Sequence, residues 1–242
     1  MLDTADNVVQ IIEWEDAVTV SSIDRLALLR TVKSHIYRYL PTTYSTPEEI
    51  EEARQREQNY AQKPFCLLDC LERCQSRLVY LDGDAFLVSD IERLLEKNFD
   101  IGVTLRRKHE IRRGRNNCQV LNAGVLFFNG SPDRTRAFLN AWIEKMKMTH
   151  EYLIEQTALT RLIAESNPQI FDDYYNQGAV IREGDSIQVI TLPCDRYNFN
   201  WIEEGIDLEK TKVVHFKGGR HDGNCFRDFL QKLEIKIPKD VK

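Results

Sequence analysis

Short apolar runs alternate with longer amphipathic stretches along most of the chain. Apolar, partly β-branched runs predict strands at 77–81 (RLVYL), 101–105 (IGVTL) and 122–129 (NAGVLFFN), and we expect the first to lie in the interior of a sheet. Apolar residues at helical spacing predict helices between them. The other predicted elements are strands near 7–14, 187–192 and 213–216, and helices at 21–40, 45–58, 63–74, 90–97, 131–148, 151–165 and 225–233.

Strands that alternate with helices predict an α/β protein with a central, mainly parallel mixed sheet flanked by helices. The sequence contains no internal repeat, low-complexity run or Gly/Ser-rich linker that would divide it. We therefore expect a single domain over residues 1–242.

Capping signals mark where several of these helices begin. Thr46, Pro47 and Glu49 form a predicted capping box with proline in the first turn, and the charge run that follows is expected to be a solvated face. Ser89 and Glu92 predict a second capping box. The run SPDRTR repeats the serine and proline signal at 131–132.

Composition places the chain among ordinary globular proteins. Of 242 residues, 42% are hydrophobic and 29% charged. No apolar run reaches about 18 residues, so we expect no integral membrane segment. The first residues, MLDTADNVVQ, lack the basic-then-apolar order of a signal peptide. The formal net charge of −5 argues against a nucleic-acid partner.

The cysteine pattern favours a reducing compartment. Three of the six cysteines, Cys66, Cys70 and Cys74, fall one helical turn apart. The sequence has no CxxC pair, so we expect no zinc site. The simplest interpretation is that the three are small core residues of a cytoplasmic protein.

Two aspartates directly after a predicted strand are the main chemical signal. Asp82 and Asp84 are separated only by Gly83, and their charges repel unless a cation or water neutralises them. In an extended chain residues i and i+2 point to the same side. Hard divalent cations prefer oxygen ligands and often keep positions for phosphate oxygens, so the pattern indicates a metal–diphosphate clamp. The alternative is that two acidic residues merely cap a turn.

Several segments in order, from about residue 63 to 221, resemble glycosyltransferase family 8, the glycogenin-like and lipopolysaccharide-type enzymes. They are KPFCLLDCLERCQSRLVYLDGDAFLV, LNAGVLFFN, EQTALTRLI, LPCDRYNFNW and VVHFKGG. The resemblance implies a GT-A fold and transfer of a hexose-like sugar from a nucleotide-diphosphate sugar, by default a UDP-sugar. It also implies Mn²⁺ or Mg²⁺ as cofactor, retention of anomeric configuration, and a glycan, lipid or protein acceptor.

The resemblance assigns roles to residues of this chain. Asp82, Asp84 and His215 become metal ligands, with Asp82 also near the donor ribose. Gln156 lies beside the anomeric carbon, with Glu155 helping to position the sugar as the second catalytic candidate. The implied substrate-binding residues are Lys63, Asp82, Asn122, Ala123, Gly124, Asn198, Gly218 and Arg220.

Elementary chemistry agrees with this assignment. A departing nucleoside diphosphate develops negative charge, which a metal ion and a lysine stabilise without proton transfer. Neutral imidazole is a good manganese ligand, which suits His215 at the end of an apolar strand. His215 as a satisfied core histidine, and Lys63 as a solvated lysine, are the simpler alternatives.

The sequence also departs from the family pattern. Glu155 stands where the family has aspartate, and Arg220 follows the last glycines where the family often has lysine. Residues 1–62 show no clear match to the opening nucleotide-binding strand, so they are treated as a divergent part beside a family-like core at 63–221.

A basic segment at 106–115 interrupts an otherwise acidic chain. Its basic residues are Arg106, Arg107, Lys108, Arg112, Arg113 and Arg115. It is either a solvated loop or a lid that meets diphosphate or an acidic acceptor.

Two other functions remain open. A phosphatase with an aspartate nucleophile also places D-x-D after a strand, but usually follows it with threonine or valine, whereas Ala85 and Phe86 follow here. A non-catalytic nucleotide-sugar-binding protein is the other alternative.

Overall fold

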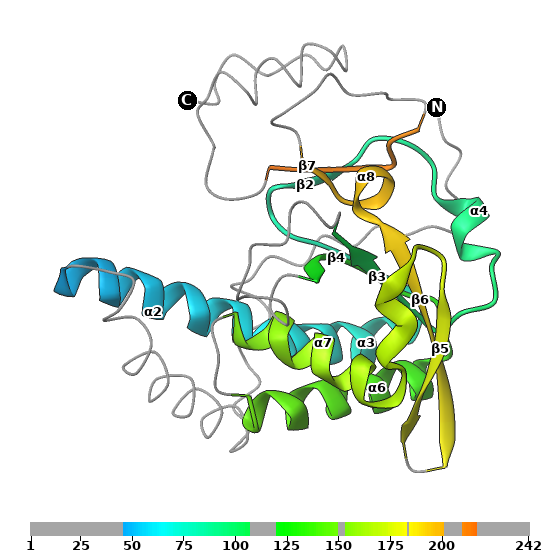
Figure 1. The fold of residues 1–242 in the computed structure, drawn as a ribbon, viewed down its shortest axis with the longest axis horizontal. Coiled ribbons are helices and arrows are strands. Elements are labelled where there is room, and N and C mark those ends of the chain that lie inside the picture. The colour runs from blue at the N-terminus through cyan, green and yellow to red at the C-terminus, as the bar shows by residue number, and fades with distance from the viewer. Residues whose placement is uncertain (1–45, 107–119, 150–152, 183, 201–209, 217–242) are drawn as a thin grey trace.

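The computed structural model describes residues 46–106, 120–149, 153–182, 184–200 and 210–216 (Figure 1). The strand expected at 7–14, the helices expected at 21–40 and 225–233, and the basic segment beyond Arg106 lie outside the described residues.

The described strands form two sheets. The larger has the order β1-β4-β3-β6-β5 and the smaller the order β2-β8-β7. The larger contains β1 (Leu78–Leu81), β3 (Ile101–Leu105), β4 (Leu121–Phe128), β5 (Gln177–Arg182) and β6 (Asp185–Pro193). The smaller contains β2 (Ala85–Leu87), β7 (Phe199–Asn200) and β8 (Val213–His215).

The α/β class is confirmed, but the direction of the strands differs from the prediction. Within the described part of the larger sheet, β3 and β6 pair in parallel, whereas β1–β4, β3–β4 and β5–β6 pair antiparallel. All eight residues of β4 are buried. A strand covered on both faces is a continuous apolar run whichever way it points, so the sequence pattern could not reveal its direction.

The strand expected at 77–81 is not interior among the described strands. β1 lies at one end of the sheet order, and Val79 is 38% exposed. Its carboxyl end leads directly into Asp82, whose backbone N–H donates to the Gly124 carbonyl at 2.8 Å. Because β1 pairs antiparallel with β4, the acidic turn after β1 lies beside the start of β4.

Helices cover both faces of the larger sheet. The longer ones, α2, α3, α6 and α7, gather on one side (Figure 1), and residues of α3, α6 and α7 share a core with β3 and β4. A second core on the other face joins α4 and α8 to β4 and β6. The bounds are α2 Pro47–Ala61, α3 Lys63–Cys74, α4 Glu92–Leu95, α6 Pro132–Lys147, α7 Ile154–Ser166, the 3₁₀ helix Pro168–Asp172 and α8 Cys194–Tyr197.

Two of the three predicted helix starts are confirmed. Thr46 and Glu49 form the capping box of α2, and Ser131 caps α6. The box at Ser89 and Glu92 is wrong: the Asp90 carboxylate accepts from the Glu92 N–H at 2.8 Å. The Ser89 hydroxyl instead accepts from Lys212 Nζ at 2.8 Å, a contact across the fold that local spacing does not reveal.

The cysteine stripe on α3 is half-buried rather than core. Cys66, Cys70 and Cys74 are of intermediate exposure, while Leu67 and Leu71 fill the interior. Burial, together with neighbouring Cys74, raises the pKa of Cys70 to about 11. The Cys70 thiol is therefore a poor nucleophile.

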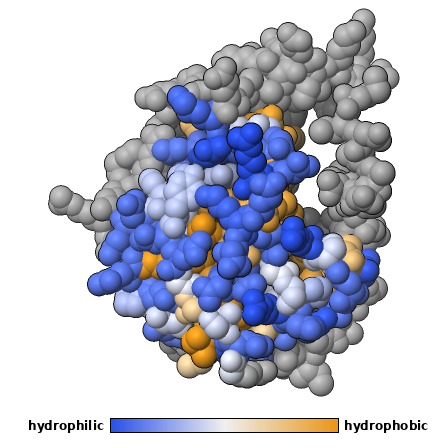
Figure 2. All heavy atoms as spheres, turned by 90° about the vertical axis from the view of Figure 1, so that its right-hand side faces the viewer, coloured by the Kyte–Doolittle hydropathy of each residue, from blue (hydrophilic) through white to orange (hydrophobic). Residues whose placement is uncertain are grey.

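The surface seen in Figure 2 is mainly hydrophilic, with hydrophobic residues in small scattered groups. Single exposed apolar residues such as Ile181, 56% exposed, are normal on a protein surface. No helix within the described ranges is both long and apolar enough to cross a lipid bilayer.

Candidate active site

The smaller sheet brings a histidine to the acidic turn. β2 begins immediately after Asp84 and pairs antiparallel with β8, so that Ala85 lies opposite His215. His215 Nε2 lies 3.0 Å from Asp84 Oδ1 and 3.7 Å from Asp82 Oδ2. One ligand atom from each of the three residues lies within 4.8 Å of the others. The spacing suits a shared cation.

A buried asparagine orients the histidine ring. Asn198, which is fully buried, donates from Nδ2 to Asn122 Oδ1 at 2.9 Å and to Thr104 Oγ1 at 2.7 Å. Its Oδ1 therefore remains to accept from His215 Nδ1, 2.8 Å away. A ring that donates from Nδ1 can present the lone pair of Nε2 to a metal ion.

The chemistry of this donor set fits a divalent ion. The Nε2 lone pair and a carboxylate oxygen repel each other at 3.0 Å unless a proton or a metal ion lies between them. Two carboxylates and one imidazole are ligands that manganese and magnesium-like ions accept, with imidazole favouring manganese. The three residues predicted as metal ligands are thus brought together.

Gly124 makes this close packing possible. A Cβ atom at this position would lie 2.6 Å from Asp82 Oδ2 and 2.8 Å from His215 Nδ1. Ordinary contacts of this kind begin near 3.4 Å. Any side chain at Gly124 would therefore displace two of the three candidate ligands.

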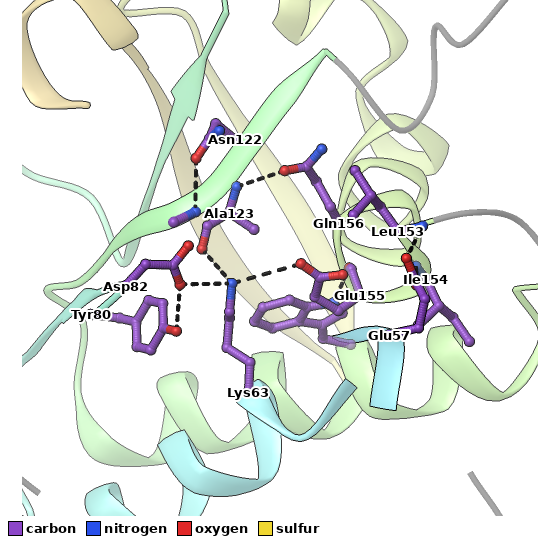
Figure 3. A network of polar contacts seen from close by, with 12 residues as sticks. Glu57, Lys63, Tyr80, Asp82, Asn122, Ala123, Leu153, Ile154, Glu155 and Gln156 are labelled. Atoms are coloured by element: carbon purple, nitrogen blue, oxygen red, sulfur yellow. Dashed lines mark hydrogen bonds and ion pairs between the residues drawn. The ribbon is translucent and has the colours of Figure 1, made fainter. Parts of the chain in front are cut away.

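Lys63 lies in a buried ring of acceptors on the other side of Asp82 (Figure 3). Its Nζ donates to the Ala123 carbonyl at 2.9 Å and lies 3.3 Å from Asp82 Oδ1 and 3.7 Å from Glu155 Oε1. Burial alone would lower the pKa of Lys63, but the nearby carboxylates of Asp82 and Glu155 hold it above its usual range. The lysine is therefore a fixed positive charge inside the site.

The two oxygens of Asp82 have different partners. The Tyr80 hydroxyl donates to Asp82 Oδ1 at 2.6 Å, the same oxygen that faces Lys63. Oδ2 faces His215. Burial, with the nearby Asp82 charge, raises the pKa of Tyr80, so the phenol keeps its proton and remains a donor. One oxygen anchors the carboxylate, and the other faces the candidate metal site.

The first turn of α7 contributes Glu155 and Gln156 to this network. Gln156 Oε1 accepts from the Ala123 N–H at 3.0 Å, and the Glu155 carbonyl accepts from Trp142 Nε1 at 2.7 Å. Glu155 Oε2 is buried without a hydrogen-bond partner among the described residues. Burial raises the pKa of Glu155, while Lys63 lowers it.

The structure connects most of the predicted site residues through these contacts. They are Lys63, Asp82, Asp84, Asn122, Ala123, Gly124, Glu155, Gln156, Asn198 and His215. Gly218 and Arg220 lie outside the described residues.

Sequence analysis missed three residues of this network. Tyr80 precedes Asp82 by two positions on an extended segment, so its direction was predictable. Glu57 lies between Ala53 and Ala61 at helical spacing, and all three are buried. A glutamate within an alanine stripe was the available signal. Thr104 carried no signal, because its role depends on the pairing of β3 with β4.

Solved structures and curated proteins do not by themselves place the chain in a family. A solved structure, that of a glycosyltransferase involved in the glycosylation of the major capsid of PBCV-1, shares 13% identity over 86% of this chain and 94% of its own, with a TM-score of 0.47. A likeness at this level carries no conclusion by itself. No curated protein matches the sequence.

The family match covers most of the chain. The sequence model of glycosyl transferase family 8 matches residues 15–220, and so begins well before the segments that carried the resemblance. Together with the mixed α/β architecture, it confirms the expected GT-A class. The chain therefore belongs to glycosyltransferase family 8 and is a glycosyltransferase.

Proposed function

We propose that this glycosyltransferase uses a UDP-sugar donor and a divalent ion, manganese in preference to magnesium, and that it retains the anomeric configuration. The observation that carries the proposal is the convergence of Asp82, Asp84 and His215 within 4.8 Å. Family membership implies a nucleotide-sugar donor and an acceptor, here a glycan, lipid or protein.

In this proposal the protein supplies a preformed electrostatic frame. A divalent ion held by Asp82, Asp84 and His215 would offset the charge of the donor diphosphate as it departs. Asn198 keeps the His215 ring in the orientation that exposes Nε2. Tyr80 fixes the other oxygen of Asp82. Groups held in advance need no reorganisation during the reaction, which is how such sites lower a barrier.

Lys63 sets the charge balance next to the ion. It is 3% exposed and contacts Asp82, Glu155 and the Ala123 carbonyl. Its main contribution is to neutralise the buried Glu155 and the partly exposed Asp82. A donor oxygen would add to these contacts rather than replace them.

Asn122, Ala123 and Gly124 at the start of β4 would line the donor sugar, with Glu155 and Gln156 opposite them. Gln156 is held by the Ala123 N–H. The buried, unpartnered oxygen of Glu155 suits a sugar hydroxyl, since a buried acceptor without a donor is costly. For retention, we propose that the departing diphosphate takes the acceptor proton on the face it leaves.

The test combines donor binding with turnover. Thermal shift is measured with a panel of nucleotide-sugars, with and without Mn²⁺, followed by release of nucleoside diphosphate and analysis of the product anomer. Specific donor binding appears as a rise in Tm through mass action.

Two variants make the test specific. Asp84→Ala should remove the manganese-dependent shift, whereas Asp185→Ala, an exposed aspartate at the start of β6, should keep it. Equal donor shifts in the wild type and Asp84→Ala would refute the metal site. An inverted product anomer would refute retention. Phosphate-ester hydrolysis without nucleotide-sugar turnover would point to a phosphatase instead.

A further inference from the structure

Glu57 is a buried acid in a helix that is otherwise mostly exposed. It is 4% exposed and lies on the same stripe of α2 as Ala53 and Ala61, which are 2% and 1% exposed. Several described positions on other faces of this helix are exposed, among them Glu52, Gln55, Arg56 and Asn59. α2 therefore turns one carboxyl group into the protein interior, against the start of α7.

The Glu57 carboxyl caps a helix that has no cap of its own. Oε1 accepts from the Leu153 N–H and Oε2 from the Ile154 N–H, each at 3.2 Å (Figure 3). Leu153 is the N-cap residue of α7 and makes no side-chain cap. The first N–H groups of a helix lack partners within it and carry partial positive charge. The Glu57 carboxyl, from a neighbouring helix, supplies acceptors for two of these N–H groups.

The capped residue is conformationally unusual. Leu153 has φ 52° and ψ 59°, in the left-handed region that side chains rarely adopt. Its carbonyl nevertheless accepts the first hydrogen bond of α7, from the Thr157 N–H at 2.8 Å. A strained residue persists where its surroundings hold it, and such residues gather at functional sites. Glu57 contributes to this by accepting from the N–H groups of Leu153 and of the residue after it.

The two residues that follow belong to the candidate active site. Glu155 and Gln156 come directly after Ile154, and both are 4% exposed. Glu155 Oε1 faces Lys63, and Gln156 Oε1 accepts from Ala123 at the start of β4. Movement of the first turn of α7 would shift both side chains relative to β4.

We propose that Glu57 is a positioning residue for catalysis, which fixes the first turn of α7 and through it Glu155 and Gln156. The inference rests on the proposed function, because it requires these two residues to act on the donor sugar. Burial and the nearby Glu155 charge raise the pKa of Glu57 to about 8. A second buried acid beside Glu155 is electrostatically unfavourable. The Leu153 and Ile154 N–H groups, which donate to Glu57, offset part of that cost.

The test compares Glu57→Gln and Glu57→Ala with Ser131→Ala. Ser131 caps α6 by accepting from the Arg134 N–H, so its loss removes a helix cap away from the site. Glu57→Gln keeps the size of the side chain but sets an amide N–H₂ against one of the two backbone donors. For each variant we measure kcat and KM for the nucleotide-sugar, Mn²⁺ affinity, and hydrogen exchange of residues 153–157.

In the Glu57 variants kcat should fall about tenfold to a hundredfold, the size expected when reacting groups are misplaced by about 1 Å. Mn²⁺ affinity should stay within about threefold, because the metal ligands lie on other elements, and KM should change less than kcat. Exchange at 153–157 should become faster. Ser131→Ala should retain kcat within about twofold, even where its Tm falls.

Three results would overturn the inference. Faster exchange with unchanged kcat would make Glu57 a structural cap only, while the proposed function would stand. Equal loss of kcat in Ser131→Ala would show that general destabilisation is the cause. A wild-type protein that turns over no nucleotide-sugar would remove the proposed function and this inference with it, and that result is visible before any variant is compared.

Discussion

Replacing Gly124 by alanine is the most direct test of the metal centre. The added Cβ would lie 2.6 Å from Asp82 Oδ2, against an ordinary contact distance of at least 3.4 Å. Asp82 or the backbone of β4 must therefore move by about 0.8 Å, and the His215 ring must move as well. Metal–ligand distances tolerate only about 0.2 Å. The geometry of two ligands is thus lost together.

The expected effects are a weaker metal site and a modestly less stable fold. We expect Mn²⁺ affinity to fall about 10- to 100-fold, equivalent to about 1.4–2.7 kcal/mol. Overpacking should lower the free energy of unfolding by about 1–3 kcal/mol. Mn²⁺ binding is measured by electron paramagnetic resonance of the free ion, and stability by urea unfolding without metal, so that the two effects are separated.

The neighbouring Gly83 provides the matched control. A Cβ there would meet no atom within 4 Å, although Gly83 lies between the two aspartates. Gly83→Ala should therefore bind Mn²⁺ as the wild type does. The reasoning is wrong if Gly124→Ala retains wild-type affinity, or if both variants lose it equally.

Three further predictions follow from the same network. Asn198→Ala removes the acceptor of His215 Nδ1 and should weaken Mn²⁺ binding about 10- to 100-fold, measured by calorimetry; unchanged affinity would refute its orienting role. Lys63→Met leaves two carboxylates without their partner and should lower the free energy of unfolding by about 3–5 kcal/mol at neutral pH, with a smaller loss in acid; a neutral effect in urea unfolding would contradict it. Burial, then the Glu155 charge, raises the pKa of Glu57 from 4.5 to about 8. Between these pH values the folded state binds more protons than the unfolded state, so the free energy of unfolding should fall as pH rises, by at most about 1.4 kcal/mol per pH unit. Glu57→Gln should flatten that slope in urea unfolding at pH 5 and pH 8, and an identical slope would refute the assignment.

Local signals in the sequence predicted the elements that local interactions determine. The helix expected at 63–74 and the strand expected at 101–105 have the observed bounds, because Pro64 and the turn residues around them limit the elements. The capping box at Thr46 is present because both partners lie three residues apart. Asp82 and Asp84 were predicted as metal ligands because they directly follow a strand, whereas His215 was implied by the family resemblance.

Features that depend on contacts between distant segments were not predictable in this way. The direction of β4 leaves no trace in a run that is buried on both faces. Ser89 looked like a helix cap but accepts from Lys212, 123 positions away. Glu57 looked like part of a solvated face, since a charge run does not show which of its members meets another helix. In each case the deciding partner is remote in the chain.

The pairing of β2 with β8 also links metal affinity to assembly of the chain. The third ligand arrives only when a strand near residue 215 docks beside one that begins at residue 85. An ion bound by both segments would tie an early and a late part of the polypeptide together. It would stabilise the docked state in proportion to how much better it binds there. Manganese titration would therefore also measure whether β8 has docked beside β2. A chain shortened to end before Val213 would keep Asp82 and Asp84 but lose His215, and should bind manganese more weakly.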